Sequence, residues 1–141
     1  MSHSAKISWQ NTGLAFQGAI DGRTDQNFKL GWSEDDKEFG ISPMGLVVGG
    51  LAGCTGMDVI SILQKKRQKV SFFEVEVEGI QGDEHPRVYQ NITIVYRFKG
   101  EDLSEKAIER AIELSVTRYC PVHAMLHDVA EIQTRFEILE D

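Results

Sequence analysis

The chain has 141 residues and a mass of 15.8 kDa, with 41% hydrophobic and 26% charged residues. This balance is typical of a globular protein that can bury a core without disulfide bonds, so we expect one domain over residues 1–141. The net charge of −7 disfavours nucleic acid as a partner, because phosphate binding needs clustered cations. The basic run Lys65-Lys66-Arg67-x-Lys69 is better explained as compensation for the negative end of a helix dipole.

The N-terminal residues indicate a cytoplasmic protein. Met1 to Trp9 contain no apolar stretch preceded by positive charge, so we see no export signal. In a reducing compartment the two cysteines, Cys54 and Cys120, are expected to rest as thiols, and any disulfide would be transient. The most apolar segment, residues 41–63, approaches the roughly 20 residues of a membrane span. Its five glycines and its polar residues favour instead a helix buried in a protein core, and we expect no membrane association.

Taken in chain order, periodicity and turn signals predict an α+β fold with strand layers around a long central helix. The pair Ser42-Pro43 is typical of a helix start, and Asp102-x-x-Glu105 resembles a capping box at the start of a second helix. Apolar residues almost all round the first half of the central helix indicate that other protein surrounds it. The expected strands are residues 6–10, 14–20, 27–32, 72–80, 88–98 and 132–138, and the expected helices are residues 43–68, 102–119 and a short one from Pro121. Strands 72–80 and 88–98 alternate and are expected to form a hairpin, the second with Val88, Ile92, Ile94, Tyr96 and Phe98 on one side. The residues spaced to face the core are Ile108, Ala111, Ile112, Ser115 and Tyr119 in helix 102–119, and Val122, Met125, Leu126 and Val129 in the short one.

Cys54 lies in the central helix beside the series Gly45-x-x-x-Gly49-x-x-x-Gly53. Glycines four residues apart form one stripe along a helix and allow another backbone to approach closely. Each glycine costs about 1 kcal/mol of helix propensity relative to alanine, so a compensating contact is expected. The same helix of a second subunit and a helix crossing within one chain both satisfy this requirement.

Cys120 directly precedes Pro121, so its sulfur is expected at the N-terminus of a helix, where the dipole favours the nucleophilic thiolate. The alternative is that Cys120 is simply a small buried residue. Asp58 follows Cys54 by one helical turn, and we assign it no catalytic role. The spacing Cys120-x-x-His123-x-x-x-His127 could also present ligands to a metal, although such a pair of histidines is usually just the flank of an amphipathic helix.

With these residues laid out, the chain resembles the osmotically inducible protein C and organic hydroperoxide resistance (OsmC/Ohr-like) family along nearly its whole length, as a divergent branch. The resemblance is carried by Ser42-Pro43-Met44-Gly45-Leu46, by the segment Leu51-Ala52-Gly53-Cys54-Thr55-Gly56-Met57-Asp58-Val59 and by Tyr119-Cys120-Pro121-Val122. It implies an intertwined homodimer with active sites at the subunit interface, and a thiol-dependent peroxidase that requires no metal, haem or flavin.

In such enzymes the first cysteine, here Cys54, attacks the organic hydroperoxide, and the second, here Cys120, closes a disulfide that a dithiol reductant reopens. Characterised members carry a glutamate after the helix-starting proline, where this chain has Met44, and an arginine in the first strand turn, where this chain has Asn11-Thr12-Gly13. The alternative function is therefore a non-enzymatic dimer of the same fold that binds a small ligand or senses redox state.

Overall fold

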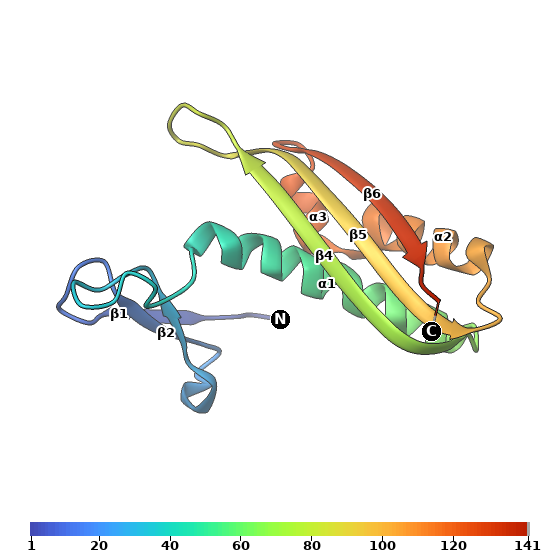
Figure 1. Ribbon diagram of the computed structural model, residues 1–141, viewed down its shortest axis with the longest axis horizontal. Helices are drawn as coiled ribbons and strands as arrows, with labels where there is room; N and C mark the ends of the chain where they lie inside the picture. Colours follow the sequence, from blue (N-terminus) through green and yellow to red (C-terminus); the bar gives the residue numbers. More distant parts are fainter. Residues whose placement is uncertain (141) are drawn as a thin grey trace. The chain divides into compact units, whose positions relative to one another are not determined.

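The computed structural model describes residues 1–140 and divides the chain into two compact units, residues 1–47 and the residues from Val48 onward (Figure 1). In the first unit, strands β1 (Ala5–Trp9), β2 (Phe16–Ile20) and β3 (Phe28–Leu30) form an antiparallel sheet in the order β1-β2-β3, with the short 3₁₀ helix η1 (Thr24–Gln26) before β3. The three predicted N-terminal strands are confirmed.

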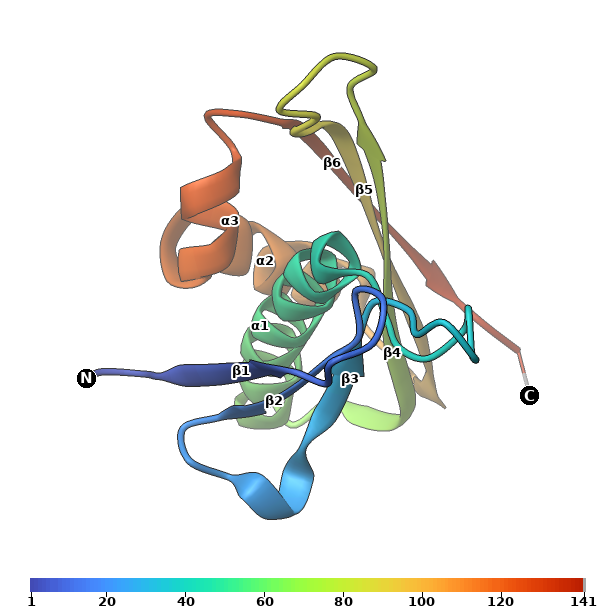
Figure 2. The ribbon, with the colours of Figure 1, turned by 90° about the vertical axis from the view of Figure 1, so that its left-hand side faces the viewer.

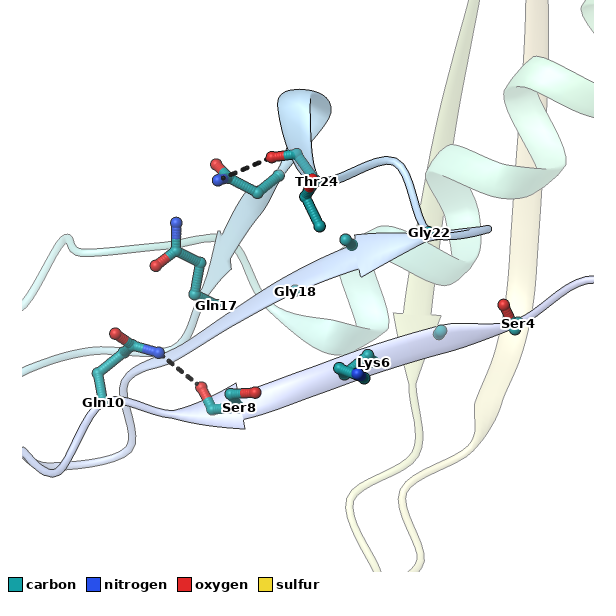
Figure 3. A pocket seen from close by; sticks show the side chains of 11 residues that line it. Ser4, Lys6, Ser8, Gln10, Gln17, Gly18, Gly22 and Thr24 are labelled. Carbon is teal, nitrogen blue, oxygen red and sulfur yellow. Dashed lines mark hydrogen bonds between the residues drawn. The ribbon is translucent and has the colours of Figure 1, made fainter.

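The two faces of this N-terminal sheet differ in chemistry. On one face Ile7 pairs with Gly18, where an added Cβ would lie 2.4 Å from the terminal methyl of Ile7, so a larger residue would require that side chain to move. On the other face, the polar side chains of β1 and β2, among them Lys6, Ser8 and Gln17, line a depression of about 540 Å³ (Figure 3). No cysteine or histidine lines this depression.

From Val48 onward, helices cover one face of a three-stranded sheet (Figures 1 and 2). The sheet has the order β4 (Lys69–Gln81), β5 (Tyr89–Glu101) and β6 (Glu131–Ile138). The helices are α1 (Pro43–Lys65), α2 (Glu105–Leu114) and α3 (Pro121–Leu126), and a π-helical turn η2 (Ser115–Tyr119) joins the last two. The α+β class and the long helix are thereby confirmed.

Alternation along β4 and β5 builds the core as the sequence predicts. Ile92, Ile94, Tyr96 and Phe98 are at most 1% exposed, and Phe98 stacks on Phe73 of β4 with ring centroids 4.8 Å apart. On the opposite face Arg97 forms ion pairs with glutamates 74, 76 and 137. The expected antiparallel hairpin is present, whereas β6 pairs with β5 in parallel. A parallel neighbour requires a crossover, which α2, η2 and α3 provide.

Local capping explains where the helices begin and end. Ser42 Oγ accepts a hydrogen bond from the Met44 N–H at 3.1 Å, as predicted. Helix α1 stops at Lys65 and not at residue 68, because Arg67 has a φ of +58° and β4 begins two residues later. The N-cap of α2 is Ser104, whose Oγ accepts from the Ala107 N–H at 3.2 Å. The predicted capping box on Asp102 is wrong, since that residue has a φ of +52°.

Helix α1 is buried along one stripe only. Leu51, Thr55, Gly56, Val59 and Leu63 are buried, whereas Met57 on the other side is 74% exposed. Beyond its chain neighbours and the backbone of its own helix, an added Cβ at Gly49, Gly50 or Gly53 would meet no atom of residues 1–140 within 4 Å. The described residues of a single chain therefore do not surround the helix, and none of their helices packs on the glycine stripe. By length and composition alone, α1 is long and apolar enough to cross a membrane, since its most apolar 18 residues have a mean hydropathy of 1.8.

The short helix α3 also departs from prediction. It contains no buried residue, and Met125 and Val129, which were expected to face the core, are 69% and 59% exposed. Tyr119, predicted on the inner face of the preceding helix, is 50% exposed because that helix changes to the π-helical turn at Ser115. Ile108, Ala111, Ile112 and Ser115 do face the core as predicted.

Candidate functional site

The structure brings Cys54 and Cys120 together although 65 positions separate them in the sequence. Cys54 lies on α1 and is half-buried, whereas Cys120 caps α3 and is only 3% exposed. Both are free thiols, and Cys54 lies near enough to Cys120 to raise the pKa of its thiol. Two thiols in this arrangement can close a disulfide when one of them is oxidised.

The backbone around Cys120 holds its sulfur in a fixed place. The Cys120 N–H donates to the carbonyl of Ser115 at 2.8 Å, which closes the π-helical turn. The Sγ atom then accepts a hydrogen bond from the His123 N–H at 3.4 Å, and Pro121 occupies the first helical position. The predicted N-cap position of Cys120 is confirmed.

The predicted shift of Cys120 towards thiolate is wrong. Burial, and to a smaller degree the neighbouring Cys54, raise the pKa of this thiol to about 11. The N–H groups of His123 and Val122 act in the opposite direction, as expected at a helix start, but burial dominates. Cys120 therefore rests as a thiol at neutral pH.

A buried chain of hydroxyl groups lies beside the cysteine pair. Tyr96 of β5 contacts Thr55 of α1 with 2.7 Å between their oxygens, and Thr55 contacts Ser115 of η2 at the same distance. Ser115 Oγ in turn donates to the Asp58 carboxylate at 2.9 Å. Burial raises the pKa of Tyr96 to about 12, and the charges of Cys120 and Asp58 also raise it.

Sequence reasoning missed this network, although it noted Asp58. Each member is polar at a position that the helix or strand periodicity turns toward the core. Because a buried polar group needs a hydrogen-bond partner, such positions could have been matched with one another. The sequence contains no signal for which pairs meet, since the three hydroxyl residues come from three distant segments.

A second group of polar residues lines a depression next to Cys120. A depression of about 420 Å³ is lined by Cys120 together with Arg118, His123 and His127. The two imidazole rings stack with centroids 5.8 Å apart, and burial lowers the pKa of His123, with a further contribution from the charge of His127. Within residues 1–140, no three histidine, cysteine or acidic side chains are grouped to hold a metal ion.

The fold and the placement of the two cysteines define a member of the OsmC-like family. The family model described as "OsmC-like protein" matches residues 34–135, which include both cysteines, and the chain belongs to this family.

Among curated proteins, Protein YhfA of Escherichia coli strain K12 is 33% identical over 135 residues, covering 96% of this chain and 97% of that protein. A crystal structure of a hypothetical protein from Aquifex aeolicus VF5 matches with a TM-score of 0.81 and 27% identity, covering 99% of both chains. The organic hydroperoxide resistance protein OhrB of Bacillus subtilis shares the fold, with a TM-score of 0.65, 14% identity and coverage of 97% and 98% of the two chains.

Proposed function

We propose that this protein is a cytoplasmic, homodimeric thiol peroxidase that reduces organic hydroperoxides through a disulfide between Cys54 and Cys120. The observation that carries the proposal is the proximity of these two free thiols, Cys54 on α1 and Cys120 at the start of α3, inside the segment that matches the OsmC-like family. Organic hydroperoxide resistance proteins share the fold, which supports the class of substrate.

The different burial of the two thiols supports their separate roles. Cys54 is half-buried, so a peroxide reaches it before it reaches Cys120, which is 3% exposed. The Cys54 thiolate attacks the distal peroxide oxygen, the O–O bond breaks, and the leaving alkoxide takes up a proton to become an alcohol. Cys54 is then a sulfenic acid.

The second half of the cycle uses Cys120. Its sulfur attacks the sulfur of the sulfenic acid, the S–O bond breaks, and the hydroxyl group leaves as water with the proton of the Cys120 thiol. The raised pKa of Cys120 suits this role, because its proton is retained until the sulfenic acid forms. A dithiol reductant then supplies two electrons and two protons and restores both thiols.

The exposed side of α1 supports the homodimer. Three glycines on this side, Gly49, Gly50 and Gly53, have open space where a Cβ would lie. A second copy related by a twofold axis would place identical stripes against each other, and backbone contact would offset the helix propensity that the glycines lose.

Peroxide turnover by wild type, Cys54→Ser and Cys120→Ser tests this function. We expect wild type to consume an organic hydroperoxide repeatedly in the presence of a dithiol and Cys54→Ser to fall to the uncatalysed rate. Without the dithiol, Cys120→Ser should consume one equivalent and stop, with Cys54 held as a sulfenic acid. Mass spectrometry of peroxide-treated wild type should show an intramolecular disulfide. A wild-type rate equal to that of Cys54→Ser would contradict the proposal.

One observation favours the alternative of a redox-sensing protein. Met44 stands where characterised peroxidases of this family carry a glutamate, so slow peroxide attack is compatible with a sensor. In that case the same assay would show stoichiometric disulfide formation without repeated turnover.

A further inference from the structure

Ser115 connects the two cysteines through two separate hydrogen bonds. Its carbonyl accepts from the Cys120 N–H at 2.8 Å, and its hydroxyl contacts Thr55, the residue that follows Cys54, at 2.7 Å. Ser115 and Thr55 are both fully buried. The backbone of one cysteine and the helix of the other are therefore joined through a single residue, by its carbonyl on one side and its hydroxyl on the other.

The number of hydroxyl protons determines which oxygen donates and which accepts in each hydrogen bond of this network. A hydroxyl group has only one proton to donate, and Ser115 gives its proton to the Asp58 carboxylate at 2.9 Å. Ser115 must then accept from Thr55, and Thr55 must accept from Tyr96. Every hydroxyl proton points towards Asp58, so the positions of the three oxygens are mutually fixed.

We propose that Ser115, held by Thr55 and Asp58, is a positioning residue that keeps Cys120 within bonding reach of Cys54 and thereby sets the stability of their disulfide. Two reacting groups that are held in place close a bond more readily than groups that must first be ordered. The π-helical turn supports this role, because its closing bond is the one between Ser115 and Cys120. The inference rests on the proposed function in that the pair must be redox-active.

The equilibrium between the protein and dithiothreitol measures this stability without any peroxide. Oxidised dithiothreitol takes two electrons and two protons from Cys54 and Cys120, whose S–S bond forms while the S–S bond of the reagent breaks. The disulfide fraction is read by mass spectrometry of alkylated protein over a series of redox buffers. The midpoint gives the reduction potential of the pair.

Ser115→Ala removes the central hydroxyl, and Thr55→Val removes the neighbouring hydroxyl with little change of shape. We expect each to lower the equilibrium constant for disulfide formation by roughly tenfold, which makes the potential about 30 mV less negative. Thr55→Ser keeps the hydroxyl and should retain the wild-type potential. Ile108→Val, at a fully buried position of α2 that is not part of the network, is the control for general loss of stability.

Three outcomes would overturn the positioning role. The first is that Ser115→Ala and Thr55→Val both keep the wild-type reduction potential. The second is that Ile108→Val changes the potential as much as they do. The third is that Thr55→Ser changes the potential as much as Thr55→Val does. A wild-type chain that forms no Cys54–Cys120 disulfide in any buffer would overturn the proposed function as well. If the pair has a measurable reduction potential and the variants shift it as expected, but the protein does not turn over peroxide, then the positioning role of Ser115 is supported and only the proposed peroxidase function is contradicted.

The charged and titratable groups near Cys120 are not altered by these substitutions, so a change in potential would not arise from a removed charge. They are Cys54 and Asp58 on α1, Tyr96 on β5, Arg118 on η2, His123 on α3 and His127 at the C-cap of α3. Potentials measured at two pH values would separate positioning from proton effects, because a pure change of geometry shifts both values equally.

Discussion

The thiol of Cys120 is subject to two opposing effects. Removal from water disfavours the thiolate, whereas the His123 N–H at the start of α3 favours it. The first effect is larger, because a single backbone hydrogen bond to sulfur at 3.4 Å replaces only part of the hydration that the anion loses. A helix start therefore does not by itself create a reactive cysteine.

This balance predicts the titration of Cys120. In Cys54→Ser, where Cys120 is the only thiol, we expect the ultraviolet absorbance of thiolate to appear with a midpoint above the ordinary value of 9.0. Because the native pKa is raised, the folded state binds this proton more tightly than the unfolded state. The associated stability is present below pH 9 and is lost as the pH rises towards about 11.

Urea unfolding of the same variant at pH 8 and pH 10 measures the loss of stability, and Cys54→Ser combined with Cys120→Ala is the matched control. We expect the single variant to lose more unfolding free energy than the control over this interval. A titration midpoint below 9.0 would show that the helix start outweighs burial.

The sequence predicted the residues of the site better than their chemistry. Cys54 and Cys120 were identified because they are the only cysteines and stand in family contexts, and the N-cap of Cys120 follows from Pro121 alone. The degree of burial of Cys120 depends on how η2 packs, which no local pattern contains. The partners of Ser115 are likewise set by tertiary packing.

At the scale of elements, the glycines of α1 serve two different purposes. Gly56 faces the sheet, where an added Cβ would lie 3.2 Å from a methyl group of Val75. Gly53 faces open space in the single chain. One glycine is required by packing within the fold, and the other has no such requirement unless a second copy covers it.

Alanine substitutions at these two positions should therefore act differently. Gly56→Ala should lower the free energy of unfolding by about 1–3 kcal/mol through overpacking, without changing the oligomeric state. Gly53→Ala should shift the protein towards monomer, because a methyl group would separate the two helices, although it raises helix propensity by about 1 kcal/mol. Sedimentation and thermal unfolding of both variants measure these effects. A Gly53→Ala protein that is more stable and still dimeric would remove the glycine stripe from the interface.

Element boundaries followed from the sequence wherever a local rule determines them. Ser42 and Pro43 start α1, and alternation defines β4 and β5. The parallel direction of β6 was not predicted, since side-chain alternation is the same in parallel and antiparallel strands. The change of α2 into a π-helical turn at Ser115 also has no signal in the spacing of apolar residues.

At the scale of the whole molecule, a single chain leaves many large apolar side chains in water. In the first unit, Ile7 and Trp9 of β1 and Ile20 of β2 are 43%, 52% and 43% exposed. In α1, Leu46 and Met57 are 39% and 74% exposed. Apolar surface on this scale marks sites of protein association, which is the basis for expecting a dimer.

A dimer held by these surfaces predicts a melting temperature that depends on protein concentration. Since association stabilises the folded state by mass action, each tenfold rise in concentration should raise the melting temperature measurably. Sedimentation equilibrium should give twice the chain mass of 15.8 kDa at micromolar concentration.

The fluorescence of Trp9 tests whether the surface around this residue is part of the interface. If the partner covers Trp9, its emission should shift to longer wavelength when dilution separates the dimer, and if the partner does not cover it, the emission should remain constant. A chain mass of 15.8 kDa together with a concentration-independent melting temperature would contradict the homodimer, and would leave α1 with an apolar, glycine-lined side exposed to solvent.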